Sequence, residues 1–368
     1  MEMKHFASQI IREIVIISLI CAPGCSRRKE PVKETWLAMG TFAAITVADQ
    51  DCEYLDKYAS TARDLMRELE NSLSVFKPDS EVSRINQSAG QCPVPVSDYT
   101  REVLELTRKY VEISGGCFDP TIAPLVQLWG FNGGTVPDES LDETSVRSLL
   151  RCIGYGHLVL SGDSAYLDTP DMQLDLGGIA KGYAVDVCYR KLMEMKAENV
   201  MINLGGNIRC HGMSRGNKPW KVGVRNPFDP HSIIGTISLT EGMAVATSGN
   251  YERFVTIGNK RYAHIIDPRT GYPVRDMAGV TVISTSAVEA DAMSTALFVL
   301  SIEEGGKVLS LMPQCHALFI PDKQPLRIWV THGFAQHFTP EPNLANHIFE
   351  LTTCYPNQDP HCAGGQPQ

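Results

Sequence analysis

The sequence predicts an α+β fold in which mixed or antiparallel sheets pack against helices. One observation favours this class over a doubly wound parallel sheet. Segments with strand character mostly occur in runs between helical segments, so strict alternation of strands and helices fails. The chain has 368 residues, of which 43% are hydrophobic, and this is enough for one large domain or two modest ones with a proper core.

Residues 1–25 differ in character from the rest of the chain. The apolar run 14–22 is too short to span a bilayer comfortably but suits the core of an export signal. Gly24 and Cys25 resemble a lipoprotein processing site, at which the cysteine takes a lipid and becomes the first mature residue. Ala22 stands where such sites usually carry leucine, so an uncleaved anchor or an ordinary signal peptide stays open. We expect an exported protein, anchored to the membrane by the lipid and facing the periplasm or the cell exterior.

The first half of the chain predicts mostly helices. Residues 26–35 are polar and predict a tether, and the alternation in 41–48 predicts a strand. Apolar residues recur at helical spacing from Leu55 to Leu73 and predict a long helix with one buried face. Ser97 is a suitable cap for a helix that ends before Gly115 and Gly116. The other elements expected here are a short helix in 76–86, an apolar helix within 118–131, a helix near 141–153, and strands near 157–161, 165–168 and 172–176.

The second half predicts mostly strands. The stretch "DLGGIAKGYAVD", residues 175–186, ends a strand and opens a helix to about Ala197; we call it the glycine corner. We expect one folded domain over 36–338 and a polar, proline-rich, disordered tail over 339–368. The remaining elements are strands near 199–204, 220–225, 234–240, 243–247, 261–266 and 279–285, helices near 288–300 and 303–312, and strands near 316–320 and 326–331.

Charge and cysteine content exclude some classes of partner and site. The net charge is −9 and no run of Lys or Arg marks the body of the chain, which argues against a nucleic-acid-binding surface. The 11 cysteines are scattered and form no C-x-x-C pair, so we expect no structural zinc site. Most are expected to be buried as small hydrophobic residues. Cys354 and Cys362 lie near each other in the tail and are candidates for a disulfide.

The glycine corner raises the question of what must approach its backbone so closely. Its "GGIAKG" segment fits neither the phosphate-binding P-loop nor the dinucleotide pattern G-x-G-x-x-G. A strand-to-helix corner without side chains exposes backbone N–H and C=O groups to a ligand. The alternative is a corner that needs glycine only for tight packing.

Other motifs favour a ligand. "INLGGNI" (202–208), "ATSGNYER" (246–253) and "HIIDPRTGYP" (264–273) are polar turns that each adjoin an apolar strand. In the helix expected over 289–300, Asp291 and Thr295 are four residues apart and share one face. A carboxylate and a hydroxyl form a hard-oxygen pair suited to Mg²⁺. The alternative for Asp291 is a helix N-cap or an acid in the first helical turn.

Together with "AMGTF" (38–42) and "SVFKPDSEVSRIN" (74–86), these motifs resemble the ApbE-type flavin transferases, the FAD:protein FMN transferases. The resemblance covers the chain from about Trp36 to Val330. It implies a bacterial, often lipid-anchored enzyme that splits FAD with Mg²⁺, releases AMP, and joins FMN to a Thr or Ser hydroxyl of a partner protein. That acceptor would be a subunit of a membrane redox complex or an exported flavoprotein. The domain 36–338 is then a catalytic domain, with its active site in a cleft between two subdomains.

The resemblance also implies site residues. The metal positions match the backbone carbonyl of Ala180 and the side chains of Asp291, Ser294 and Thr295. The positions that bind FAD match Met39, Phe76, Phe118, Asp119, Thr121, Gly177, Tyr183 and Ile266.

Phosphoryl transfer to a hydroxyl needs a proton acceptor. His264 is the candidate, oriented by Asp267, and Asp291 shares the catalytic work through the metal. The alternative for His264 is a histidine that caps the end of a strand. Lys181 either contacts a phosphate or is a solvated surface lysine. Two other functions stay open: an FAD pyrophosphatase that yields FMN and AMP, and a non-catalytic flavin-binding lipoprotein.

Overall fold

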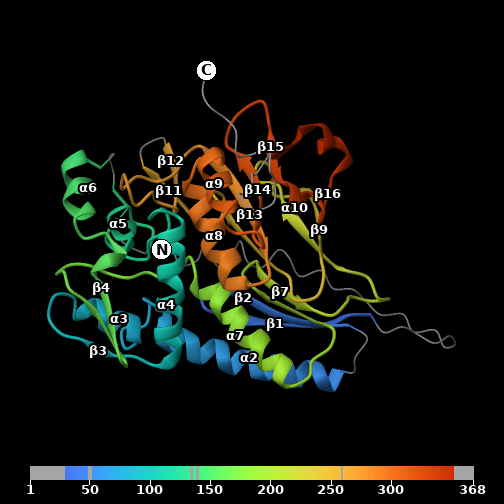
Figure 1. The fold of residues 1–368 in the computed structure, drawn as a ribbon, viewed down its shortest axis with the longest axis horizontal. Coiled ribbons are helices and arrows are strands. Elements are labelled where there is room, and N and C mark those ends of the chain that lie inside the picture. The colour runs from blue at the N-terminus through green and yellow to red at the C-terminus, as the bar shows by residue number, and fades with distance from the viewer. Residues whose placement is uncertain (1–29, 49–51, 133–135, 138–140, 258–259, 352–368) are drawn as a thin grey trace, which may run out of the picture.

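The structure is a computed structural model, and Figure 1 shows its helices and strands packed side by side around one large sheet. The predicted α+β class is confirmed. Smaller antiparallel sheets and all the longer helices pack around the large one. The structure describes residues 30–48, 52–132, 136–137, 141–257 and 260–351.

The large sheet has nine strands and is antiparallel except at one edge. Strands β15 and β17 pair in parallel, and the other neighbours pair antiparallel. The inner strand β13 is buried along its whole length, which is why its apolar run shows no alternation. In spatial order the strands are β1 (Val32–Ala38), β2 (Thr41–Val47), β6 (Val200–Leu204), β7 (Asn207–His211), β10 (Ala244–Gly249), β13 (Met277–Ser284), β14 (His316–Pro321), β15 (Ile328–Thr331) and β17 (Ile348–Leu351).

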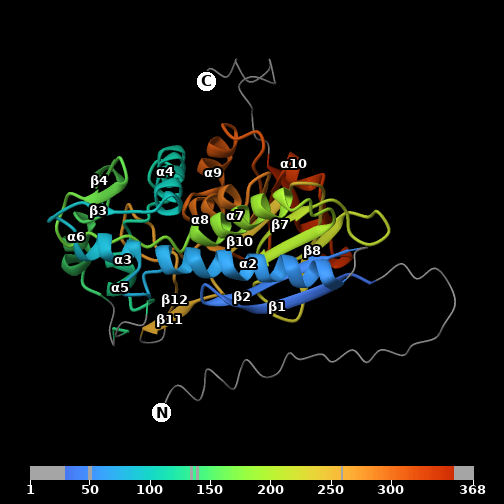
Figure 2. The same cartoon turned by 90° about the horizontal axis from the view of Figure 1, so that it is seen from below.

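Helices cover one face of this sheet. Figures 1 and 2 show α2 (Cys52–Leu73) and α7 (Ala180–Glu194) lying along the sheet, with α8 (Ala287–Val299) next to α7. The helical face predicted from Leu55 to Leu73 is confirmed, because its apolar residues are buried in the main core. Around this layer lie α3 (Glu81–Gln87), α4 (Asp98–Ile113) and α9 (Ile302–Leu309). Ser97 caps α4 as predicted, and its hydroxyl accepts a hydrogen bond from the Thr100 N–H.

A second core fills the other face. It lies under a three-stranded sheet and a short helix, and residues of β7 such as Ile208 and Cys210 point into it. The three strands, in spatial order, are β16 (Phe338–Pro340), β9 (Ile233–Leu239) and β8 (Trp220–Arg225), and the helix is α10 (His332–Ala335).

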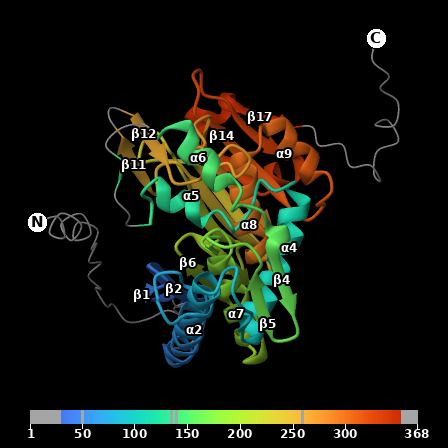
Figure 3. The ribbon, with the colours of Figure 1, turned by 90° about the vertical axis from the view of Figure 1, so that its left-hand side faces the viewer.

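A third core lies beside the main layers. Figure 3 shows α5 (Ala123–Leu128) and α6 (Glu143–Leu150) close to the hairpin of β11 (Phe254–Ile257) and β12 (Lys260–Ala263). Its centre is Trp129, whose indole N–H donates to the Gly271 carbonyl at 2.9 Å. The remaining elements are β3 (Val94–Pro95), β4 (Leu158–Ser161), β5 (Ser164–Leu167) and the 3₁₀ helix η2 (Tyr155–His157).

Two predicted boundaries are wrong. The tether predicted over 26–35 ends earlier, because β1 begins at Val32 and its residues alternate between half-buried and exposed along the edge of the sheet. The tail predicted over 339–368 is ordered up to Leu351. Residues 342–347 form the 3₁₀ helix η3 (Pro342–His347), and Ile348 pairs with Ile328 of β15. Cys354 and Cys362 lie outside the described residues.

The strand predicted over 172–176 is also absent from the described chain, apart from one isolated bridge. The backbone N–H and C=O of Leu174 bind the side chain of Asn86 instead of a neighbouring strand. Strands β7 and β11 are present in the structure, although no strand was predicted over their residues. Within the described ranges, no helix combines the length and apolar character needed to cross a membrane.

Candidate active site

Each of the helices α7 and α8 supplies a carboxylate that accepts hydrogen bonds from the N-terminus of the other helix. Asp186 in α7 accepts hydrogen bonds from the Ser286 hydroxyl at 2.8 Å and from the Ala287 N–H at 2.9 Å, at the start of α8. Asp291 in α8 accepts one from the Gly182 N–H at 2.9 Å, in the first turn of α7. A helix N-terminus carries partial positive charge, so each carboxylate stabilises the other helix. We call α7 and α8 the cross-capped helix pair.

This arrangement excludes the alternative in which Asp291 is a cap or a first-turn acid of its own helix. Helix α8 begins at Ala287 and is capped by Ser286, so Asp291 lies beyond its first turn. The carboxylate therefore does not cap its own helix. It is 5% exposed and is held against the glycine corner.

The glycines of the corner permit this close approach. A Cβ on Gly182 would come within 2.3 Å of the Ala287 carbonyl oxygen and 2.7 Å of the Asp291 Cβ. A Cβ on Gly178 would lie 3.1 Å from the Phe118 ring and 3.2 Å from the Thr295 hydroxyl. Tight packing therefore explains Gly182, and Gly178 lies directly between a predicted flavin position and a predicted metal position.

The structure brings the predicted metal positions together. Ala180 is the first residue of α7, and Asp291, Ser294 and Thr295 follow one another along α8. The Ser294 hydroxyl donates to the Asp291 carbonyl at 2.9 Å and lies 2.9 Å from the Ser248 hydroxyl. Thr295 is the more open of the two hydroxyls, because Ser294 is completely buried.

These donors fit Mg²⁺ chemically. They comprise one carboxylate, two hydroxyls and one backbone carbonyl, all hard oxygen ligands. Oδ2 of Asp291 binds Gly182, which leaves Oδ1 as the oxygen that can face a cation. In the part of the chain that the structure describes, no group of three or more His, Cys, Asp and Glu side chains could hold a metal. A single carboxylate suits Mg²⁺ when substrate phosphates supply further oxygens.

Lys181 is not a freely solvated surface lysine. Its ammonium donates to the Gly177 carbonyl at 2.7 Å and lies 3.8 Å from Oδ1 of Asp291. The cation is therefore folded back over the glycine corner, where it would face an anionic ligand.

Three predicted flavin positions form one loop. Asp119 accepts hydrogen bonds from the backbone N–H groups of Thr121 at 2.8 Å and Tyr155 at 3.0 Å. Burial raises the pKa of Asp119, although these hydrogen bonds act against the rise. Thr121 and Asp119 are buried, so they fix the loop that carries Phe118 to Gly178.

The other flavin positions lie in different surroundings. Met39 is in the turn between β1 and β2, and the Phe76 ring is 66% exposed. Tyr183 is fully buried and its hydroxyl donates to Glu102 of α4, while Ile266 belongs to the third core. The side chains of Tyr183 and Ile266 are thus engaged in packing, whereas Phe76 presents an open apolar surface.

His264 directly follows β12, which ends at Ala263. The pKa of the His264 imidazole is lowered to about 4, mainly by burial and also by the charges of Arg253 and Lys181, whereas the hydrogen bond to the Arg253 backbone and the charge of Asp175 raise it. Its Nδ1 lies 3.2 Å from the Arg253 carbonyl, which can only accept a hydrogen bond. Nδ1 therefore carries the proton, and Nε2 is left as an acceptor.

The expected role of Asp267 is wrong. Both of its carboxylate oxygens bind the guanidinium of Arg269 at 2.9–3.2 Å. The carbonyl of Arg253 orients the His264 ring instead.

Two polar residues of this region, Ser248 and Asp186, were not predicted from the sequence as site residues. Ser248 lies in the "ATSGNYER" motif and contacts both Ser294 and Thr295. Asp186, the last residue of the glycine corner, binds Arg209 at 2.7 Å in addition to the start of α8. An acidic residue at the end of a ligand-binding corner was a possible signal for Asp186, but nothing local indicated its partner.

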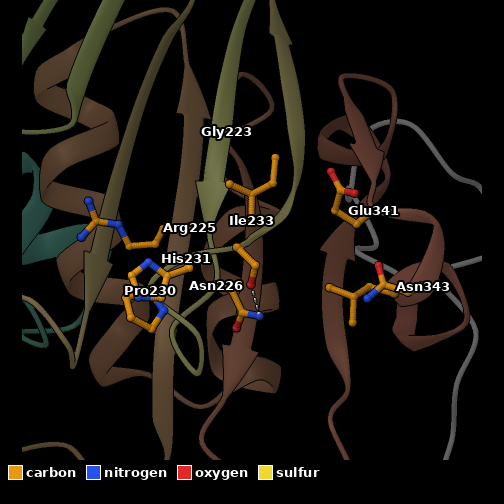
Figure 4. A pocket seen from close by; sticks show the side chains of 10 residues that line it. Gly223, Arg225, Asn226, Pro230, His231, Ile233, Glu341 and Asn343 are labelled. Carbon is orange, nitrogen blue, oxygen red and sulfur yellow. Dashed lines mark hydrogen bonds between the residues drawn. The ribbon is translucent and has the colours of Figure 1, made fainter. Parts of the chain in front are cut away.

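A separate groove lies between β8, β9 and the segment after β16. Its volume is about 620 Å³. Figure 4 shows Arg225 and His231 on one side and Glu341 and Asn343 on the other. None of the predicted site residues lines it, so it is distinct from the glycine corner.

Residues 39–319 match the sequence model of the ApbE family. The chain is 33% identical over 294 residues to the FAD:protein FMN transferase of Vibrio cholerae, covering 79% of this chain and 88% of the relative. It is 36% identical over 268 residues to an FAD:protein FMN transferase of Klebsiella pneumoniae, covering 71% and 81%. Among solved structures, the flavin transferase ApbE from Vibrio cholerae has a TM-score of 0.75 and 31% identity, covering 84% of this chain and 99% of that one. The ApbE protein from Thermotoga maritima has the same TM-score and identity, covering 84% and 100%.

Proposed function

This chain belongs to the ApbE family and is a flavin transferase, and we propose that it transfers the FMN part of FAD to a Thr or Ser hydroxyl of a partner protein. The proposed reaction depends on Mg²⁺ and releases AMP. The observation that carries the proposal is the position of Asp291 and Thr295 against the glycine corner, at the N-terminus of α7.

The N-terminus of α7 suits the pyrophosphate of FAD. Its N-cap residue, Ile179, makes no side-chain capping bond, and its first turn holds no acidic residue. Asp291 already accepts the Gly182 N–H of this turn, so the attraction for an anion comes from the remaining positive charge of the helix end and from the full charge of Lys181 beside it.

In the proposed step, the acceptor hydroxyl oxygen bonds to the phosphorus of the FMN moiety. The bond from that phosphorus to the bridging oxygen breaks, and AMP leaves with the oxygen. Mg²⁺, when bound, supplies charge neutralisation for the phosphates. Asp291, Thr295 and the Ala180 carbonyl would hold the ion. The hydroxyl proton passes to Nε2 of His264, which is neutral at pH 7.

The test uses FAD, Mg²⁺ and protein fractions from cells that lack this gene. We expect FAD alone to be consumed slowly, because a transferase must exclude water, which competes at high concentration. Adding membrane and periplasmic fractions should accelerate AMP release and leave flavin fluorescence on a protein band after denaturing electrophoresis. Fast FAD consumption that ignores every fraction and yields only free FMN would instead establish a pyrophosphatase.

We also propose that the mature protein begins at a lipidated Cys25 and faces the periplasm or the cell exterior. The support is the short apolar run followed by Gly24 and Cys25. Mass spectrometry of the protein from the detergent phase should find a diacylated N-terminal Cys25. An unmodified N-terminus at another residue would remove this proposal and leave the transferase proposal intact.

A further inference from the structure

Asn207, the first residue of β7, has a buried amide oxygen without a partner. The residue is 4% exposed, and Oδ1 accepts no hydrogen bond within the described part of the chain. A buried acceptor of this kind destabilises the folded protein unless something supplies a donor. The position directly follows Gly205 and Gly206 of the "INLGGNI" motif, for which the metal and flavin assignments give no role.

Two contacts fix where Asn207 lies relative to α7. Arg209 of β7 binds Asp186 of α7, and two residues later His211 lies 3.3 Å from the Tyr189 hydroxyl, three residues later in α7. The strand and the helix therefore run in the same direction. Stepping back two residues along the strand covers about 6.6 Å, which matches about four residues of helix. Asn207 is thus level with the first turn of α7.

That turn lies next to the predicted metal residue Asp291, because its Gly182 N–H binds the Asp291 carboxylate. The alternation of side chains places Asn207 on the same face of the sheet as Arg209, under the helices. Its neighbour Ile208 points into the second core on the opposite face. Ser248, which touches Ser294 and Thr295, is four residues beyond Ala244, the partner of Arg209, and so shares the face of Asn207.

We propose that Asn207 is a further positioning residue of the FAD and metal site. Its Oδ1 accepts a hydrogen bond from an O–H group that arrives with the ligand, either a hydroxyl of FAD or a water held by the metal ion. The orphaned oxygen is then a feature of the ligand-free protein, and binding satisfies it. This inference rests on the proposed FAD site but does not depend on transfer to an acceptor.

The test compares Asn207→Leu with Asn203→Leu in the full chain. Leucine resembles asparagine in shape and carries no polar atom. Asn203 belongs to the same motif, but its Oδ1 already accepts the Gly206 N–H at 3.0 Å, and it pairs with Ile208, so it faces the other side of the sheet. Flavin fluorescence gives the Kd for FAD in two buffers, one with Mg²⁺ and one with EDTA, and no acceptor protein is present.

We expect Asn207→Leu to raise the Kd for FAD about tenfold relative to Asn203→Leu, the loss that one hydrogen bond in a buried site accounts for. A loss in both buffers identifies a hydroxyl of FAD as the donor, and a loss confined to Mg²⁺ identifies a metal-held water. The melting temperature of the ligand-free protein should not fall in Asn207→Leu, because the change removes an unsatisfied group.

Equal FAD affinity of the two variants in both buffers would overturn the proposal and leave Asn207 with a structural role. If Asn207→Leu does not fold, Asn207→Ala is judged by the same affinity criterion. If the proposal about Asn207 fails, the test of FAD-dependent AMP release is not affected. If the transferase proposal fails, the FAD affinities of the two variants still test the role of Asn207, because they are measured without an acceptor protein.

Discussion

Replacing Asp291 by asparagine is expected to slow AMP release from FAD by about 10²–10³-fold, the usual cost of removing one electrostatic contact in a transition state. Asparagine keeps an oxygen that can accept the Gly182 N–H, so the first turn of α7 stays capped. What it lacks is the negative charge that would hold the cation. The measurement is chromatography of AMP formed from FAD and Mg²⁺, together with circular dichroism and the melting temperature.

The matched control is Asp186→Asn, the same substitution at the other carboxylate of the cross-capped helix pair. Asp186 binds Arg209 and the start of α8 and has no place among the metal positions. This variant should lose stability, because a buried ion pair is broken, while its folded molecules still release AMP. Normal turnover by Asp291→Asn, in protein stripped with EDTA and resupplied with Mg²⁺, would show that the metal assignment is wrong.

Replacing His264 by alanine is expected to slow flavin transfer by about 10²–10⁴-fold, the usual contribution of a general base. The affinity for FAD should change little, because proton transfer matters mainly in the transition state. Single-turnover transfer to an acceptor protein measures the rate, and fluorescence titration measures the affinity. The control is Asp267→Asn, because Asp267 binds Arg269 and does not contact the imidazole; its transfer rate should stay within a few-fold of the parent.

The pH profile gives an independent check on His264. The general base acts in its neutral form, and burial lowers its pKa to about 4. Transfer should therefore stay constant as the pH falls through 6.5, the ordinary range of histidine, and decline only as it approaches about 4. An acid limb centred near 6.5, or one that persists in His264→Ala, would exclude this histidine as the base.

Patterns that are local in the chain predicted the fold correctly. The periodicity from Leu55 to Leu73 and the cap at Ser97 each depend on residues within one or two helical turns. The shared face of Asp291 and Thr295 is equally local. The boundary at Val32 was missed because β1 is an edge strand whose alternating residues look polar in composition.

The contacts that complete the site are not local. Asp291 binds the Gly182 N–H across 109 residues, and Asp186 binds the Ala287 N–H across 101. No spacing in the sequence indicates such a pairing, because it arises only when α7 and α8 pack together. Proximity in sequence is also insufficient at Asp267, because its carboxylate binds the neighbouring Arg269 and not His264.

The early start of β1 would keep the folded domain close to the proposed lipid anchor at Cys25. Only the six residues 26–31 separate Cys25 from Val32. Val32 is seven steps along the chain from Cys25, and an extended chain spans at most about 3.6 Å per step, so this segment reaches at most about 25 Å. If Cys25 carries the lipid, the start of β1 stays within about 25 Å of the membrane surface. The anchor would then select acceptors by their distance from the membrane. Acceptor hydroxyls close to the lipid headgroups would meet the catalytic domain often, whereas hydroxyls on domains that extend far from the membrane would not.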